Sequence, residues 1–222
     1  MKKIKLIFVS FFAVTILINF SFAQNLKYCG QVEAEERIKN ENPQLYQQIL
    51  QHKNELENYT RAYATQRSGE RGTIYTIPVV FHIIHNFGPE NISDEQVHDQ
   101  IRILNEDYRK LNSDTNEIVA AFKGIAKDVE FEFKLAQKDL QGNCTNGIIR
   151  STTDVSFWPR AKYLNIKVVK SIGNDVAGYT YTPGSVHTTP SIDGIIIDHR
   201  FVGSIGAGDP DRSRAITHEI GH

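Results

Sequence analysis

The stretch that decides the fold is IYTIPVVFHIIH, residues 74–85. β-Branched and aromatic residues dominate it, and residues 79–84 form a near-continuous apolar run. A strand that is apolar at successive positions is typical of a sheet covered on both faces. We therefore expect a central, buried strand over residues 74–85.

The segments after this strand predict further helices and strands. Ser93 with Gln96 three residues later predicts a capping box at a helix start. Apolar residues at spacings of 3 and 4 then predict an amphipathic helix over 94–111. We also expect strands at 129–135, 164–168 and 194–198, a loop at 173–191 with at most a short edge strand at 179–181, and a helix over 209–222. This order predicts an α/β fold in which two helices pack on a mixed, twisted sheet.

Upstream of the central strand, the composition changes. Residues 67–73 hold two Gly, two Arg and no apolar residue, which predicts an exposed linker open to proteolysis. Residues 24–66 are polar and helical in pattern, with a helix start at Asn42-Pro43. They hold too little apolar surface for a core of their own. We therefore expect a helical pro-segment and linker at 24–72, followed by a globular part at 73–222.

The N-terminus predicts export. Three lysines precede an apolar run at 6–20, and Ser21-Phe22-Ala23 resembles a cleavage site, so we expect a signal peptide at 1–23. Fifteen residues are few for a membrane span, which needs about 20. An uncleaved anchor is the alternative. No second long apolar run follows, so we expect a secreted protein without membrane attachment after signal cleavage.

The composition excludes several classes of protein. The 222 residues are 40% hydrophobic and 23% charged, unlike a disordered chain. The net charge of −1 offers no basic excess for nucleic acid, so no nucleic-acid partner is expected. Two cysteines are too few for a disulfide scaffold.

The chemistry is at the end of the chain, where His218-Glu219-Ile220-Gly221-His222 forms the motif H-E-x-x-H. On a helix, residues i and i+4 share a face, so the two imidazoles can bind one Zn²⁺. Glu219 beside them can take a proton from water while zinc polarises a scissile carbonyl. Eight histidines in 222 residues make a chance match rare, although a helix with two surface histidines is the simpler alternative.

A catalytic zinc site needs three protein ligands and one open position. No residue follows His222 to supply the third, so an upstream ligand is a possibility. His199, after a buried strand, is the best placed. His82 and His85 are three apart on a strand and face opposite ways. The remaining histidines are expected to face solvent or to lie in the pro-segment.

Five blocks together carry a family resemblance. They are Ile77 to Ile84, Ile103 to Arg109, Lys162 to Ile166, Asp193 to Ile197 and Thr217 to His222. In these blocks the chain resembles the pappalysin family of metzincin metalloproteases, particularly its bacterial ulilysin-like (cytophagalysin) branch. The resemblance spans roughly 74–222, which corresponds to the upper, N-terminal catalytic subdomain of that family.

The resemblance implies that His218 and His222 are zinc ligands and that Glu219 is the general base. The family pattern continues as H-E-x-x-H-x-x-G-x-x-H, with a Met-turn and a lower subdomain that this sequence lacks. The sequence therefore resembles the front part of such an enzyme, and it holds no residue that could set the cleavage preference.

Cys29-Gly30 resembles a Cys-Gly pair in the pro-segments of ulilysin-like enzymes. By that resemblance, Cys29 is a zymogen zinc ligand whose thiolate displaces the catalytic water. A Cys29–Cys144 disulfide, favoured by export, and two unpaired thiols are the alternatives.

The resulting hypothesis is a secreted zinc endopeptidase made as a zymogen, which acts on protein or peptide substrates. A truncated, non-catalytic fragment that acts at most as a binding module is the main alternative. A third hypothesis is a different H-E-x-x-H hydrolase with His199 as its third ligand.

Overall fold

A computed structural model describes residues 27–66, 72–173, 176–187 and 189–222 of the chain. The expected signal peptide at 1–23 and residues 67–71 of the expected linker lie outside the described residues. In the described part of the chain, no helix combines the length and the apolar character needed to cross a membrane.

The strands form one sheet in the order β1-β6-β7-β5-β2-β3, and β4 pairs with the second half of β2. All pairs are parallel except β6 with β7, which is antiparallel. The strands are β1 (Lys27–Cys29), β2 (Tyr75–Ile84), β3 (Phe131–Leu135), β4 (Ile148–Ser151), β5 (Leu164–Val169), β6 (Val176–Tyr179) and β7 (Ile195–Asp198). The mixed sheet confirms the expected α/β class.

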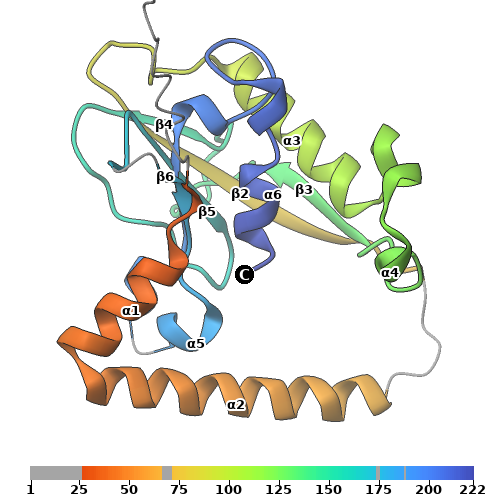
Figure 1. Cartoon of the computed structure of the whole chain (residues 1–222). Helices are drawn as coiled ribbons and strands as arrows, with labels where there is room; N and C mark the ends of the chain where they lie inside the picture. The colour runs from red at the N-terminus through yellow and green to blue at the C-terminus, as the bar shows by residue number, and fades with distance from the viewer. Residues whose placement is uncertain (1–26, 67–71, 174–175, 188) are drawn as a thin grey trace, which may run out of the picture.

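Among the described residues, α1, α2 and α3 are the long helices, and the other helices are one or two turns (Figure 1). The α-helices are α1 (Gln31–Glu41), α2 (Pro43–Gln66), α3 (Asp94–Tyr108), α4 (Ala120–Lys123), α5 (Pro183–Val186) and α6 (Ala215–Ile220). The 3₁₀ turns are η1 (Ser113–Glu117), η2 (Pro190–Ile192), η3 (His199–Phe201) and η4 (Pro210–Arg212).

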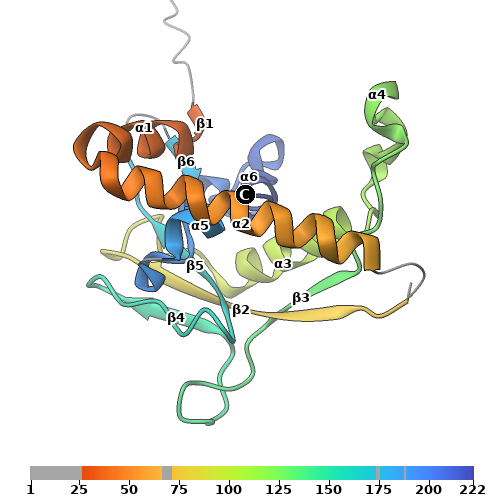
Figure 2. The ribbon, with the colours of Figure 1, turned by 90° about the horizontal axis from the view of Figure 1, so that it is seen from below.

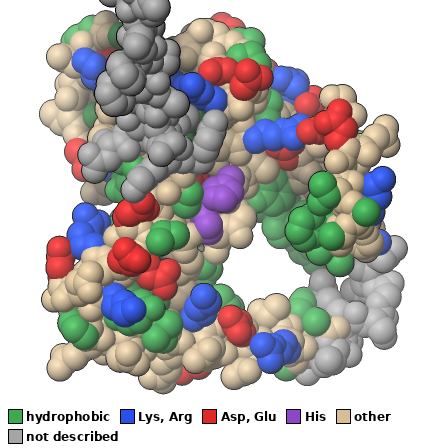
Figure 3. All heavy atoms as spheres, in the orientation of Figure 1, with side chains coloured by type: hydrophobic (Ala, Val, Ile, Leu, Met, Phe, Trp, Pro, Cys, Tyr) green, Lys and Arg blue, Asp and Glu red, His purple; other side chains and the backbone are tan. Residues whose placement is uncertain are grey.

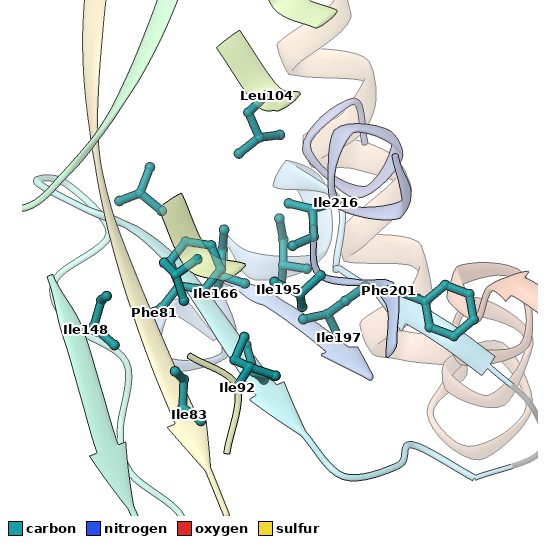
Figure 4. Packing of buried hydrophobic residues seen from close by; sticks show 14 of the residues in the cluster. Phe81, Ile83, Ile92, Leu104, Ile148, Ile166, Ile195, Ile197, Phe201 and Ile216 are labelled. Atoms are coloured by element: carbon teal, nitrogen blue, oxygen red, sulfur yellow. The ribbon is translucent and has the colours of Figure 1, made fainter. Parts of the chain in front are cut away.

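Strand β2 is the central strand that the sequence predicts. Residues Val79, Val80, Phe81 and Ile83 are fully buried, because β5 pairs along one edge and β3 and β4 share the other. Alternate side chains enter a core between the sheet and two helices, where Leu104 of α3 and Ile216 of α6 pack against sheet residues (Figure 4). The two packed helices of the prediction are therefore α3 and α6.

The opposite face of β2 is covered by a loop rather than a helix. His82 is 1% exposed, and the rings of Phe157 and Trp158 lie 5.8 and 6.3 Å from its ring. Asn165 Oδ1 of β5 accepts from His82 Nε2 at 3.0 Å, and the same side chain accepts from the Trp158 amide and donates to the Trp158 carbonyl. Burial on both faces explains why β2 is apolar at successive positions.

Two expected boundaries were wrong. The helix predicted to reach 111 ends at Tyr108, because Lys110 takes a φ of 54° and turns the chain away; Leu111 is 71% exposed. The strand predicted from 129 begins at Phe131, since Glu130 has a φ of 61° that breaks the extended backbone. Both residues occupy the left-handed region that L-residues rarely adopt.

Other expectations were wrong in detail. Helix α6 begins at Ala215 rather than near 209, because residues 210–212 form a separate 3₁₀ turn. The edge strand lies at Val176–Tyr179, ahead of the expected 179–181. Strand β4 has no counterpart among the expected elements.

The polar N-terminal segment lies across the sheet edge and below α6. Strand β1 extends the sheet, α1 turns away from it, and α2 runs beneath the C-terminal end of α6 (Figures 1 and 2). The predicted start of α2 is confirmed, since Asn42 Oδ1 accepts from the Leu45 amide at 3.1 Å and Pro43 opens the helix. Among residues 43–64 of α2, Ile49 alone is buried.

Candidate metal and catalytic site

Helix α6 presents two histidines to the hollow between the sheet and α2. The Nε2 atoms of His218 and His222 are 3.1 Å apart, and their rings are nearly perpendicular. Both side chains are exposed, and histidine side chains lie at the rim of the hollow in Figure 3. Partial desolvation, together with the positive charge of His218, lowers the pKa of His222, which favours the neutral imidazole that binds metals.

The Glu219 side chain lies against strand β6, close to the same two imidazoles. The residue is 1% exposed, and neither carboxylate oxygen has a hydrogen-bond partner in the described part of the chain. Burial raises the pKa of Glu219 to about 7. Weaker polar interactions with the Cys29 thiol and the Thr180 backbone offset part of this shift. An unpartnered buried carboxylate is costly, which is typical of a functional group.

Strand pairing places Cys29 against the same site. β1 pairs in parallel with β6, Cys29 lies opposite Gly178, and the Gly30 amide donates to the Gly178 carbonyl at 3.1 Å. The Cys29 Sγ consequently lies 3.3 Å from His222 Nε2. Burial is the main cause that raises the pKa of the Cys29 thiol, and the Glu219 charge adds to it.

Gly178 allows Ile197 and Glu219 to approach strand β6 closely, and the sequence analysis missed it. A Cβ at this position would lie 2.7 Å from Ile197 Cδ1 and 3.5 Å from Glu219 Cγ. Glycine within a strand often marks a close approach of another chain segment, and that signal could have identified it.

The donor set fits a metal ion. One ligand atom each from Cys29, His218, Glu219 and His222 can be chosen so that all four lie within 4.8 Å of one another. Thiolate and imidazole are the donors that zinc prefers. This group unites the four site residues that the sequence predicts.

The alternative ligand, His199, does not belong to this group. It is 8% exposed, and its Nδ1 lies 3.2 Å from the Lys170 carbonyl and 3.3 Å from Asp198. His82 is held in the sheet, and the His187 ring lies 4.0 Å from the ring of His52 in α2.

The alternative disulfide is absent as well. Both cysteines are free thiols, and Cys144 lies in an exposed turn opposite Lys138, whose Nζ is 3.8 Å from its sulfur.

A cavity of about 370 Å³ extends from the site between the sheet, α5 and α2. Its walls include Glu219 and His222 at one end, Tyr181 and Gly184 along the side, and Leu56 of α2 on the outside. Helix α2 thus forms one wall of the cavity next to the candidate metal ligands.

No protein-family model matches the chain, and no curated protein sequence matches it. Solved structures do match. A Tannerella forsythia promirolysin mutant is 33% identical with a TM-score of 0.73, over 87% of this chain and 67% of that one. T. forsythia mature mirolysin in complex with a cleaved peptide is 36% identical with a TM-score of 0.63, over 69% and 63%.

Mirolysin in complex with compound 9 is 34% identical with a TM-score of 0.62, over 68% of this chain and 63% of that one. The chain thus spans about two thirds of the length of these relatives. At this identity and coverage, the match extends beyond the fold to the family, as the sequence resemblance predicted. The chain belongs to the pappalysin family of metzincin metalloproteases, in its ulilysin-like branch.

Proposed function

We propose that this chain comes from a secreted zinc endopeptidase made as a zymogen. The observation that carries the proposal is the convergence of Cys29, His218, Glu219 and His222 at the edge of the sheet. The complex of mature mirolysin with a cleaved peptide supports a peptide substrate. A signal peptide at 1–23 is the proposed route of export.

His218 and His222 are the proposed zinc ligands from the catalytic part. Their Nε2 atoms are 3.1 Å apart and face the same hollow, as two donors to one ion must. Zinc bound there would act as a Lewis acid on the scissile carbonyl and lower the pKa of water.

Glu219 is the proposed general base. Its carboxylate is next to the first histidine, buried, and free of hydrogen bonds in the described part of the chain. A pKa raised to about 7 makes it able to take a proton near neutral pH and return it to the leaving amine. The raised value has burial as its largest cause.

Substrate would bind along β6, where the pro-segment now pairs. β6 is bonded to β7 on one side and to β1 on the other. An extended peptide can add to such an edge through main-chain hydrogen bonds. Since β1 occupies this edge and Cys29 contacts His222, the pro-segment blocks both the peptide groove and the metal position.

A second contact holds the pro-segment in place. Ile49 of α2 is 3% exposed, and α2 packs on α5 at Gly184, where a Cβ would lie 3.1 Å from the Ile49 carbonyl oxygen and 3.3 Å from the Lys53 amide nitrogen. The proposed pro-segment is therefore attached by the pairing of β1 with β6, by the Cys29 thiol and by the α2–α5 contact.

The coverage of the relatives supports the proposed boundary at 72/73. The promirolysin match covers 87% of the chain and the mature mirolysin match 69%, a difference of about 40 residues. That is the size of the described pro-segment, residues 27–66.

The test is zinc content together with peptide cleavage by the native protein, whose intact mass is recorded first. Glu219→Ala should retain one zinc per chain and lose activity by about 100-fold or more, which is the usual contribution of a general base. Glu117→Ala, at an exposed glutamate outside the site, is the matched control and should keep full activity. Activity that survives Glu219→Ala would contradict the mechanism, and a native protein without zinc would favour the non-catalytic alternative.

A further inference from the structure

Helix α6 is too short to hold itself in place. It has six residues, and its N-cap residue, Arg214, makes no side-chain cap. Isolated helices shorter than about 12 residues are marginal in water, so tertiary contacts must fix this one. Ile216 and Glu219 are buried on its inward face, and α6 contacts strands β6 and β7 and helix α3.

Thr217 is the residue of α6 that forms hydrogen bonds with α3. Its hydroxyl donates to Asp107 Oδ2 at 2.7 Å, and its carbonyl accepts from the Tyr108 hydroxyl at 3.2 Å. In a regular α-helix, the Gly221 amide would donate to the Thr217 carbonyl. Here it donates to the His218 carbonyl, which leaves the Thr217 carbonyl available. Tyr108 thereby satisfies one of the carbonyls that a helix end leaves without an intrahelical partner.

Arg214 adds an ionic contact at the other end of α6. Its guanidinium pairs with Asp107 at 3.2 Å and with Asp114 at 2.6 Å. The Asp107 side chain is only 9% exposed, so this charge pair is shielded from water on one side. Asp107 thus contacts both Arg214 before α6 and Thr217 within it.

The end of α3 is itself tied to the sheet. Asn105 accepts from the Phe133 amide at 2.7 Å and donates to the Phe133 carbonyl at 3.0 Å, and the Tyr108 ring packs edge-on against Phe133. A continuous set of hydrogen bonds therefore runs from β3 through α3 to the residue that precedes His218.

We propose that Asp107 and Tyr108 are positioning residues, which orient α6 so that His218 and His222 converge on one metal ion. This inference rests on the proposed zinc function. Partners that orient metal ligands typically change metal affinity by 10- to 100-fold when removed. Because Thr217 is one peptide unit from His218, loss of either bond would let α6 shift and carry both imidazoles away from the Cys29 thiol at the metal position.

The experiment measures the zinc affinity of the full chain by competition with a chromophoric chelator, with Zn²⁺ as the only added ligand. Thr217→Val, which keeps the shape but loses the hydroxyl, and Asp107→Asn are each expected to weaken zinc binding by about tenfold. Thr217→Ser keeps the hydroxyl and should restore wild-type affinity.

Asp99→Asn is the matched control. Asp99 is also on α3, but it accepts hydrogen bonds from the Ser204 amide and hydroxyl, away from α6. It should lower stability without changing zinc affinity. Tyr108→Phe, which retains the packed ring, is the second variant if Thr217→Val does not fold by circular dichroism.

The outcomes separate the two claims. Wild-type affinity in Thr217→Val, Asp107→Asn and Tyr108→Phe would overturn the positioning role and leave the zinc site intact. An equal loss in Asp99→Asn would also overturn it, since the effect would then follow stability. A wild-type chain that binds no zinc would overturn the proposed function, and the positioning role with it.

Discussion

Helices α2 and α6 differ in almost every respect. α2 has 24 residues, yet among residues 43–64 only Ile49 is buried. α6 has six residues, buries Ile216 and Glu219, and is hydrogen-bonded to α3. The longer helix is attached at few points, whereas the shorter one is held on several sides. A removable inhibitor and a fixed metal site would need this contrast.

The largest expected effect comes from removing α2 and β1 altogether. Cleavage within 67–71 followed by separation of the pro-segment should raise peptide cleavage by about 100-fold, the effect of releasing an inhibitor held by about 3 kcal/mol. Cys29→Ser in the intact chain should gain less, because β1 and α2 still cover the groove. Both rates are measured with one reporter peptide; equal gains would mean that the thiol alone inhibits.

The second prediction concerns the burial of Glu219 and its effect on the pH dependence of stability. In the metal-free chain, the pKa of Glu219 rises from 4.5 to about 7 on folding. The folded state then holds more protons between these values, so stability falls as pH rises through this window. At about 1.4 kcal/mol per unit, the loss is about 3 kcal/mol.

Denaturant unfolding between pH 4 and 8 measures this effect. The stability of Glu219→Gln should not fall over this pH range, whereas that of Glu117→Gln should fall as in the wild type. Parallel curves for wild type and Glu219→Gln would show that the carboxylate is more hydrated than its burial indicates.

The smallest effect concerns the attachment of α2. Gly184→Val places a side chain against the backbone of Ile49 and Lys53, so α2 must shift outwards. Hydrogen exchange of α2 amides should rise about fivefold, as for a loss near 1 kcal/mol, while exchange in α6 stays unchanged. Gly124→Val is the matched control, since a Cβ there meets nothing within 4 Å. Faster exchange in both variants would contradict a specific α2–α5 contact.

The apolar periodicity of the sequence predicted much of this fold. Burial on both faces of β2 and the apolar stripe of α3 each leave a regular signal over many residues. Likewise, the spacing of His218 and His222 is a local property of one helix. These features depend on neighbours in sequence, so the chain alone reveals them.

The polar contacts could not be predicted in the same way. Gln96 was expected to complete a capping box, but only Ser93 caps, through the Gln96 amide at 3.2 Å. The Gln96 side chain is buried instead and binds the Val202 carbonyl at 2.8 Å and the Ala207 amide at 3.0 Å. Asp107 and Thr217 are likewise 110 residues apart. Such pairs have no periodic pattern.

The most direct test is zinc X-ray absorption spectroscopy of the intact chain loaded with one equivalent of Zn²⁺, compared with Cys29→Ser. The account predicts one sulfur and two imidazole nitrogens around the ion, with the sulfur lost in Cys29→Ser and both imidazoles retained. A zinc environment without sulfur in the wild type would contradict the proposed binding of the Cys29 thiolate to zinc. The absence of paired imidazoles would contradict the metal site at His218 and His222 itself.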